Sequence, residues 1–148
     1  MFQFKFTSVL NYRRQIEDVR QQEFAQSKRL WEQEKSLLEQ YHELWRTCLS
    51  EWRIRQRDAV EILEVELYQR YMLRLREEIR RQAEKVKECL VIMDEKREVL
   101  LHAQKERKAL DKLREYHFSE YRTAMLRKET GFLDEIATQR FNARERKS

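Results

Sequence analysis

The sequence has no proline and only one glycine, Gly131, in 148 residues. Average proteins contain about 7% glycine and 5% proline, and tight turns depend on both residues. The chain can therefore make few sharp turns. Its two cysteines, Cys48 and Cys89, also give no disulfide framework.

Long apolar runs are missing as well. No segment approaches the roughly 18 consecutive apolar residues that a membrane span needs. The first residues do not form a signal peptide, because Lys5, Arg13 and Arg14 interrupt them and no apolar core follows. We therefore expect a protein of the cytosol.

The sequence offers no pattern that is typical of an enzyme or a metal site. One glycine cannot build a phosphate-binding loop, so the chain is not itself a P-loop ATPase. His42, His102 and His117 lack metal-ligand spacing, and no nucleophile and base can be paired. We predict no catalytic site, no metal and no cofactor.

Charged residues make up 40% of the chain, and apolar residues make up 41%. So much charge cannot be buried, yet the apolar share is too large for a disordered chain. A narrow apolar seam with charged flanks fits both observations. Apolar residues follow heptad-like spacing over two stretches: Val9, Tyr12, Ile16, Val19, Leu30, Leu37, Tyr41, Leu44, Cys48 and Trp52, then Met72, Leu75, Ile79, Ala83, Val86, Leu90 and Met93.

These patterns predict an all-α fold, a long antiparallel two-helix coiled-coil hairpin that forms a single domain over residues 1–148. We expect one helix over about 8–54, a turn over about 55–58, and a second helix over about 59–143. The turn is placed by Asp58-x-x-Glu61, which matches a capping box. A bend centred on Asp58 puts Trp45 opposite Tyr71 and separates the two cysteines by about 30 Å along the helix axis.

The first six residues contain Phe2, Phe4 and Phe6. In the predicted register they lie beside Leu110 and Leu113 of the second helix. We expect them to form a structural clasp that closes the open end of the hairpin, just before Thr7 or Ser8 caps the first helix.

Aromatic residues also gather near the turn, where the seam is too narrow to hide all of them. Exposed Trp and Tyr side chains are typical of partner sites. Beyond the first helix's reach, the second helix should continue alone with an excess of basic residues, and the whole chain carries a net charge of +5. Such a stretch favours an acidic partner.

Three stretches of the chain form a characteristic series. They are Phe4-x-Phe6-x-x-Val9-Leu10-x-Tyr12-Arg13, Tyr68-Gln69-x-Tyr71-Met72-x-x-Leu75-x-x-x-Ile79, and Lys108-x-Leu110-x-Lys112-Leu113 with Tyr121 and Leu133-Asp134-Glu135-x-Ala137-x-x-Arg140. Together they resemble the FliJ family, the coiled-coil proteins of flagellar type III export. The match follows the family's order over nearly the whole chain.

The resemblance implies a non-enzymatic stalk and adaptor, similar to the central stalk of rotary ATPases. Such a protein inserts in the hexameric export ATPase ring and promotes its assembly and activity. It also links the ring to the cytoplasmic domain of the export gate and to export chaperones. It serves flagellum biogenesis and motility, and is peripherally associated with the cytoplasmic side of the inner membrane at the flagellar base.

The resemblance also implies two partner sites. The gate-binding positions of the family fall on Leu38, Tyr41, Trp45, Tyr71 and Leu75. The terminal end, which would enter the ATPase ring, carries Arg122, Arg127, Lys128, Arg140 and Arg144.

Alternatives to the flagellar stalk stay open at this point. One is the equivalent stalk of a virulence type III injectisome. Others are a basic RNA-binding coiled coil and a scaffold that dimerises through its seam. We expect a monomer in isolation and no nucleic acid partner, because acidic residues are interspersed with the basic ones near the turn.

Overall fold

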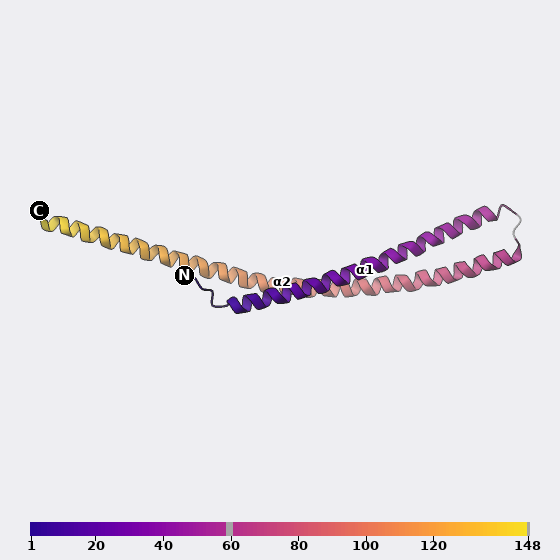
Figure 1. The fold of residues 1–148 in the computed structure, drawn as a ribbon, viewed down its shortest axis with the longest axis horizontal. Coiled ribbons are helices and arrows are strands. Elements are labelled where there is room, and N and C mark those ends of the chain that lie inside the picture. Colours follow the sequence, from indigo (N-terminus) through magenta and orange to yellow (C-terminus); the bar gives the residue numbers. More distant parts are fainter. Residues whose placement is uncertain (59–60, 148) are drawn as a thin grey trace. The chain divides into compact units, whose positions relative to one another are not determined.

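The computed structural model describes residues 1–58 and 61–147 and consists of two long helices (Figure 1). Helix α1 spans Thr7–Arg55 and helix α2 spans Ile62–Lys147. The helices pack against each other as a hairpin, which confirms the predicted fold class. The chain forms two packed units: one combines Met1–Glu17 with the stretch from Ala103 onward, and the other is Asp18–His102.

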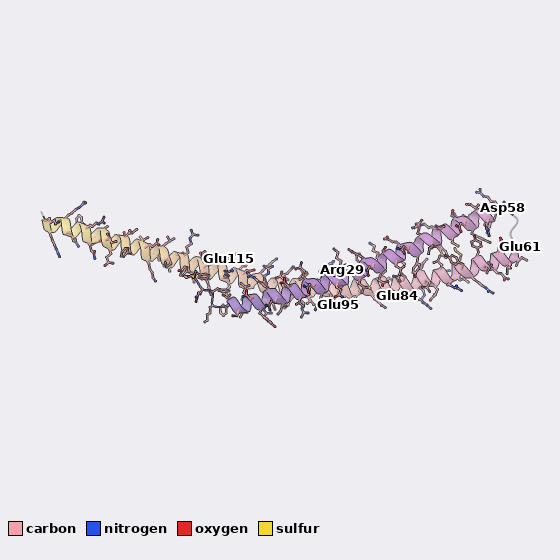
Figure 2. The ribbon with its side chains drawn as sticks, viewed as in Figure 1. Arg29, Asp58, Glu61, Glu84, Glu95 and Glu115 are labelled. Carbon is pink, nitrogen blue, oxygen red and sulfur yellow. The ribbon has the colours of Figure 1, made fainter. Side chains whose placement is uncertain are left out.

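The connection between the helices differs from the predicted capping box. Asp58 and Glu61 lie near the connected ends of the two helices (Figure 2). The predicted start of the second helix, residue 59, lies outside the described residues. Because α2 begins at Ile62, Asp58 is not its capping residue. Instead the Glu61 carbonyl accepts a hydrogen bond from the Val65 amide, at 3.2 Å.

In the unit Asp18–His102, the buried seam of α2 agrees with the predicted one at Leu75 and Met93. It differs by one residue at two positions, where Gln82 and Cys89 are buried in place of Ala83 and Leu90. Its buried positions repeat every seven residues, first at Leu75, Gln82 and Cys89 and then at Met93 and Leu100. Leu90, expected in the seam, is 38% exposed. The apolar pattern alone favoured Ala83 over its neighbour Gln82, because Gln82 is polar.

Gln82 occupies the seam because its amide group finds partners on α1. The Gln82 side-chain amide donates to the Glu34 backbone carbonyl at 2.9 Å and also to the Glu34 carboxylate. A buried polar group costs little when it is hydrogen-bonded in this way. A single polar residue in a coiled-coil seam also specifies its register.

The α1 seam agrees with the predicted one at Cys48, which is buried, but differs from it at three positions. Val19, Leu30 and Leu44 are between 46% and 49% exposed. Phe24 and Trp31, which were not predicted in the seam, are half-buried. The Phe24 ring lies 5.6 Å from the Arg97 guanidinium of α2, so an aromatic residue and a cation replace aliphatic contacts there.

Cross-helix contacts in this unit lie up to one helical turn beyond the predicted partners. The rings of Trp52 and Tyr68 are 4.9 Å apart, whereas a bend centred on Asp58 would place Glu64 opposite Trp52. The Lys96 ammonium lies 3.9 Å from the Glu23 carboxylate. The shift arises because the connection extends to Glu61, three residues past Asp58.

In the other unit, Phe2 and Phe4 pack on α2, while the Phe6 ring contacts that of Phe4. Leu10 is the most buried side chain, at 2% exposed, and Phe4 is 8% exposed. Ring centroids of Phe2 lie 5.3 Å from Phe118 and 5.5 Å from Tyr121. These ring contacts fall farther along α2 than Leu110 and Leu113, which are half-buried.

The start of α1 is not capped by the Thr7 or Ser8 side chain. The Thr7 hydroxyl donates back to the Phe4 carbonyl at 2.7 Å. The first turn begins with the Leu10 amide, which donates to the Phe6 carbonyl at 2.9 Å. This arrangement ties the phenylalanine segment to the helix that follows it.

Next to this segment, ion pairs connect α1 to α2. Arg107 bonds to the carboxylates of both Glu17 and Asp111. Arg14 also reaches Asp111, at 3.2 Å. The hydrogen bond from Arg107 and the charge of Arg14 hold the pKa of Asp111 below its usual value.

The lowered pKa of Asp111 predicts acid sensitivity. Its stabilising effect is fully present above the usual pKa of 3.8 and is lost as pH falls through the lower folded pKa. Asp111→Asn should therefore flatten the fall in the free energy of unfolding over that acidic range. Urea denaturation in a pH series measures this, with Asp134→Asn as the control; equal slopes for the wild type and Asp111→Asn would contradict it.

Within the described residues, neither helix contains an apolar stretch long enough to cross a bilayer.

Candidate functional site

Two grooves flank the seam near the connected ends of the helices, within the unit Asp18–His102. The first, of about 380 Å³, we call the acidic groove, because Glu51 is its one charged residue. Its lining residues are Leu44, Thr47, Cys48, Glu51, Leu67, Tyr68 and Tyr71.

The second groove is larger, about 630 Å³, and we call it the tryptophan groove. Its lining residues are Trp45, Leu49, Trp52, Gln56, Val65, Tyr68, Gln69, Met72, Leu73 and Arg76. Tyr71 and Leu73 line different grooves because residues two apart on a helix point about 200° from each other. The two grooves therefore lie on opposite sides of the seam.

The residues predicted for gate binding are divided among these surfaces. Tyr71 is 45% exposed and lines the acidic groove, while Trp45 lines the tryptophan groove. Leu75 is only 6% exposed and lies in the seam. Leu38 and Tyr41 are half-buried. The sequence did not predict this division. Residue spacing shows which residues share a face of one helix, but it does not show how the second helix is oriented against that face.

At the other end, α2 continues past the start of α1 (Figure 1). We call its stretch from Arg122 to Lys147 the overhang, since the last ring contact from the start of the chain is made to Tyr121. Within the overhang every residue except Ile136 is exposed. The predicted basic residues Arg122, Arg127, Lys128, Arg140 and Arg144 are all among the exposed ones.

The overhang also exposes large apolar side chains that the sequence argument, centred on charge, passed over. Phe132, Leu133 and Phe141 are between 60% and 64% exposed. Met125 and Leu126 are 40% and 56% exposed. The signal was present in the sequence, because apolar residues seven apart at 125 and 132, and at 126 and 133, share helix faces.

The cysteines show no sign of reactivity. Cys48 and Cys89 are buried and free. Burial, together with the charge of Glu51, raises the pKa of the Cys48 thiol, which disfavours the nucleophilic thiolate. Across the described residues no group of histidine, cysteine and carboxylate side chains could hold a metal ion.

Comparison with protein families shows to which family this two-helix chain belongs. A family model described as Flagellar FliJ protein matches residues 2–146. The chain belongs to the flagellar FliJ family. It is therefore a structural component of flagellar export, and its partners belong to the export apparatus at the flagellar base. No match was found among curated proteins or among solved structures.

The match to the FliJ family includes the residues at both ends of the hairpin. The family model covers the phenylalanine segment, both helices and nearly all of the overhang. The exposed surfaces of this FliJ-family chain are thus candidates for contacts with other export components.

Proposed function

We propose that this FliJ-family protein is a non-enzymatic stalk and adaptor of flagellar type III export. Its overhang enters the hexameric export ATPase ring and promotes ring assembly and ATP hydrolysis. The connected end of the hairpin contacts the cytoplasmic domain of the export gate, and the protein also serves export chaperones on the cytoplasmic side of the inner membrane.

The observation that carries this proposal is the exposed overhang on a FliJ-family chain. From Arg122 to Lys147 a single helix presents basic and apolar side chains on all sides. A ring pore surrounds whatever it holds, so a helix exposed on all sides suits it better than a helix with one free face. The basic residues favour an acidic pore through long-range attraction.

The direct test is to mix the purified protein with its export ATPase. ATP turnover should rise, and hexamers should form at a lower ATPase concentration, as measured by phosphate release and by sedimentation. The full chain without residues 122–147 should give neither effect. Absence of stimulation by the full-length protein at micromolar concentration would overturn the stalk role.

The gate contact gives a second prediction. Replacing Trp45 and Tyr71 together by alanine should weaken binding to the gate's cytoplasmic domain by about tenfold or more, because large aromatic side chains dominate interface energies. Both residues are at least partly exposed, so helicity should remain unchanged by circular dichroism. The matched control is Tyr12→Ala, a 59% exposed tyrosine in the other unit. Unchanged gate affinity would remove the assignment.

A further inference from the structure

The tryptophan groove has the lining of a protein-binding site. Trp45, Trp52 and Met72 are among its lining residues, and Leu73, which also lines it, is 66% exposed. Trp and Tyr are enriched where interfaces concentrate their binding energy. Trp45 is one of the predicted gate positions, whereas Trp52, Met72 and Leu73 are not. Gate contact therefore accounts for only part of this surface.

The charge carried by the lining of the groove is positive only. Arg76 is its only charged lining residue. A smaller groove of about 220 Å³ continues along the same face, lined by His42, Trp45, Arg76 and Ile79. Neither lining contains a carboxylate, whereas the acidic groove across the seam contains Glu51.

Arg76 also differs from the arginines near it. Arg80 and Arg81 both pair with Glu77, and Arg55 pairs with Glu64 across the helices. Among residues 1–58 and 61–147, Arg76 makes no ion pair. An arginine beside apolar rings binds a carboxylate more strongly than one in open solvent does, because the rings lower the local dielectric.

The dimensions of the two grooves fit a helix. They extend along α1 from His42 to its end at Arg55, with Gln56 directly after it, which corresponds to about 20 Å at 1.5 Å per residue. That length accommodates about four turns of a third helix lying along the hairpin. A helix in such a groove presents anchors at heptad-like spacing.

We propose that the tryptophan groove docks an amphipathic helix of a partner protein, with a carboxylate on its apolar side that pairs with Arg76. The aliphatic residues of that helix contact Trp45, Trp52 and Leu73. The pairing with Arg76 selects acidic helices over basic ones. The inference goes beyond the proposed stalk function, since it adds a docking site on the side of the seam away from Tyr71. Trp45 is the residue that this site shares with the proposed gate contact.

A displayed library of 18-residue amphipathic helices tests the proposal, with the apolar positions and one central position randomised. Selection on the immobilised full chain should enrich Asp or Glu at the central position. Selected peptides should then change the fluorescence of Trp45 and Trp52 in a Trp31→Phe background. Failure to enrich any helix, or enrichment with no acidic preference, would overturn the proposal.

Charge reversal makes the test specific. Arg76→Glu should lower the affinity for the selected acidic peptides by about tenfold or more. It should raise the affinity for copies of these peptides with lysine at the central position. Arg70→Glu is the matched control, because Arg70 is exposed and lines neither groove. It carries the same change in charge and should leave binding unchanged. Equal effects of the two variants would contradict a specific pair at Arg76.

A single-stranded RNA oligonucleotide is the competing probe, because aromatic rings beside an arginine also stack on bases. The proposal requires that RNA neither displaces the selected peptides nor changes the fluorescence of Trp45 and Trp52 at physiological salt. Displacement by RNA would replace the docking helix with nucleic acid and overturn the proposal.

Discussion

Leu10→Ala should lower the free energy of unfolding by about 2–4 kcal/mol, among the largest effects of any single truncation in this chain. Leu10 is 2% exposed, and it packs in the unit where the phenylalanine segment and the first turns of α1 meet α2. Alanine removes its apolar contacts and leaves a cavity. Urea denaturation followed by circular dichroism measures the loss, and amide hydrogen exchange should locate it in the first turns of α1.

The adjacent residue provides the control. Val9 is 43% exposed, so Val9→Ala should change stability by only about 0.5 kcal/mol. The two variants differ in burial but share a location and a helical conformation. If both variants lower the free energy of unfolding by the same amount, Leu10 does not form a packed core at this end.

Reversing the charge of Arg122, Arg127 and Lys128 to glutamate should remove most of the stimulation of the export ATPase. If the overhang enters an acidic pore, three acidic residues in place of three basic ones turn attraction into repulsion. We expect at least about a tenfold higher concentration for half-maximal stimulation at low salt. The difference should shrink as salt is raised, because salt screens exposed charges.

The control reverses three exposed basic residues in the other unit, namely Lys28, Arg29 and Lys87. Net charge changes by the same amount, while the overhang stays intact. Stimulation should remain near the wild-type level. If both triple variants fail equally, net charge rather than the overhang determines the interaction with the ATPase.

Heptad spacing was enough to predict two helices and their antiparallel pairing. It was not enough to identify every seam residue, because Gln82 and Cys89 are buried where Ala83 and Leu90 were predicted. The reason is physical: Gln82 is stable in the seam only because Glu34 of α1 supplies both of its acceptors. Long-range polar pairs of this kind leave no local pattern in the sequence.

The candidate sites were predictable to different degrees. The exposed basic residues of the overhang follow from the unequal lengths of the two helices. The division of Trp45 and Tyr71 between two grooves does not, because it depends on how α1 and α2 are rotated about their own axes. Nor does the absence of an ion pair at Arg76 among the described residues, which depends on which carboxylates its neighbours already bind.

The buried pair of Gln82 and Glu34 has a mechanical consequence. If one helix slid along the other by a heptad, Gln82 would face Ser27 or Tyr41 and would lose both hydrogen bonds to Glu34. A seam of leucines alone would permit such sliding at little cost, since every heptad would find equivalent partners. The pair thus resists sliding of one helix along the other under an axial pull. In the proposed stalk role, where one end contacts the ATPase ring and the other the gate, it would keep the distance between those contacts constant.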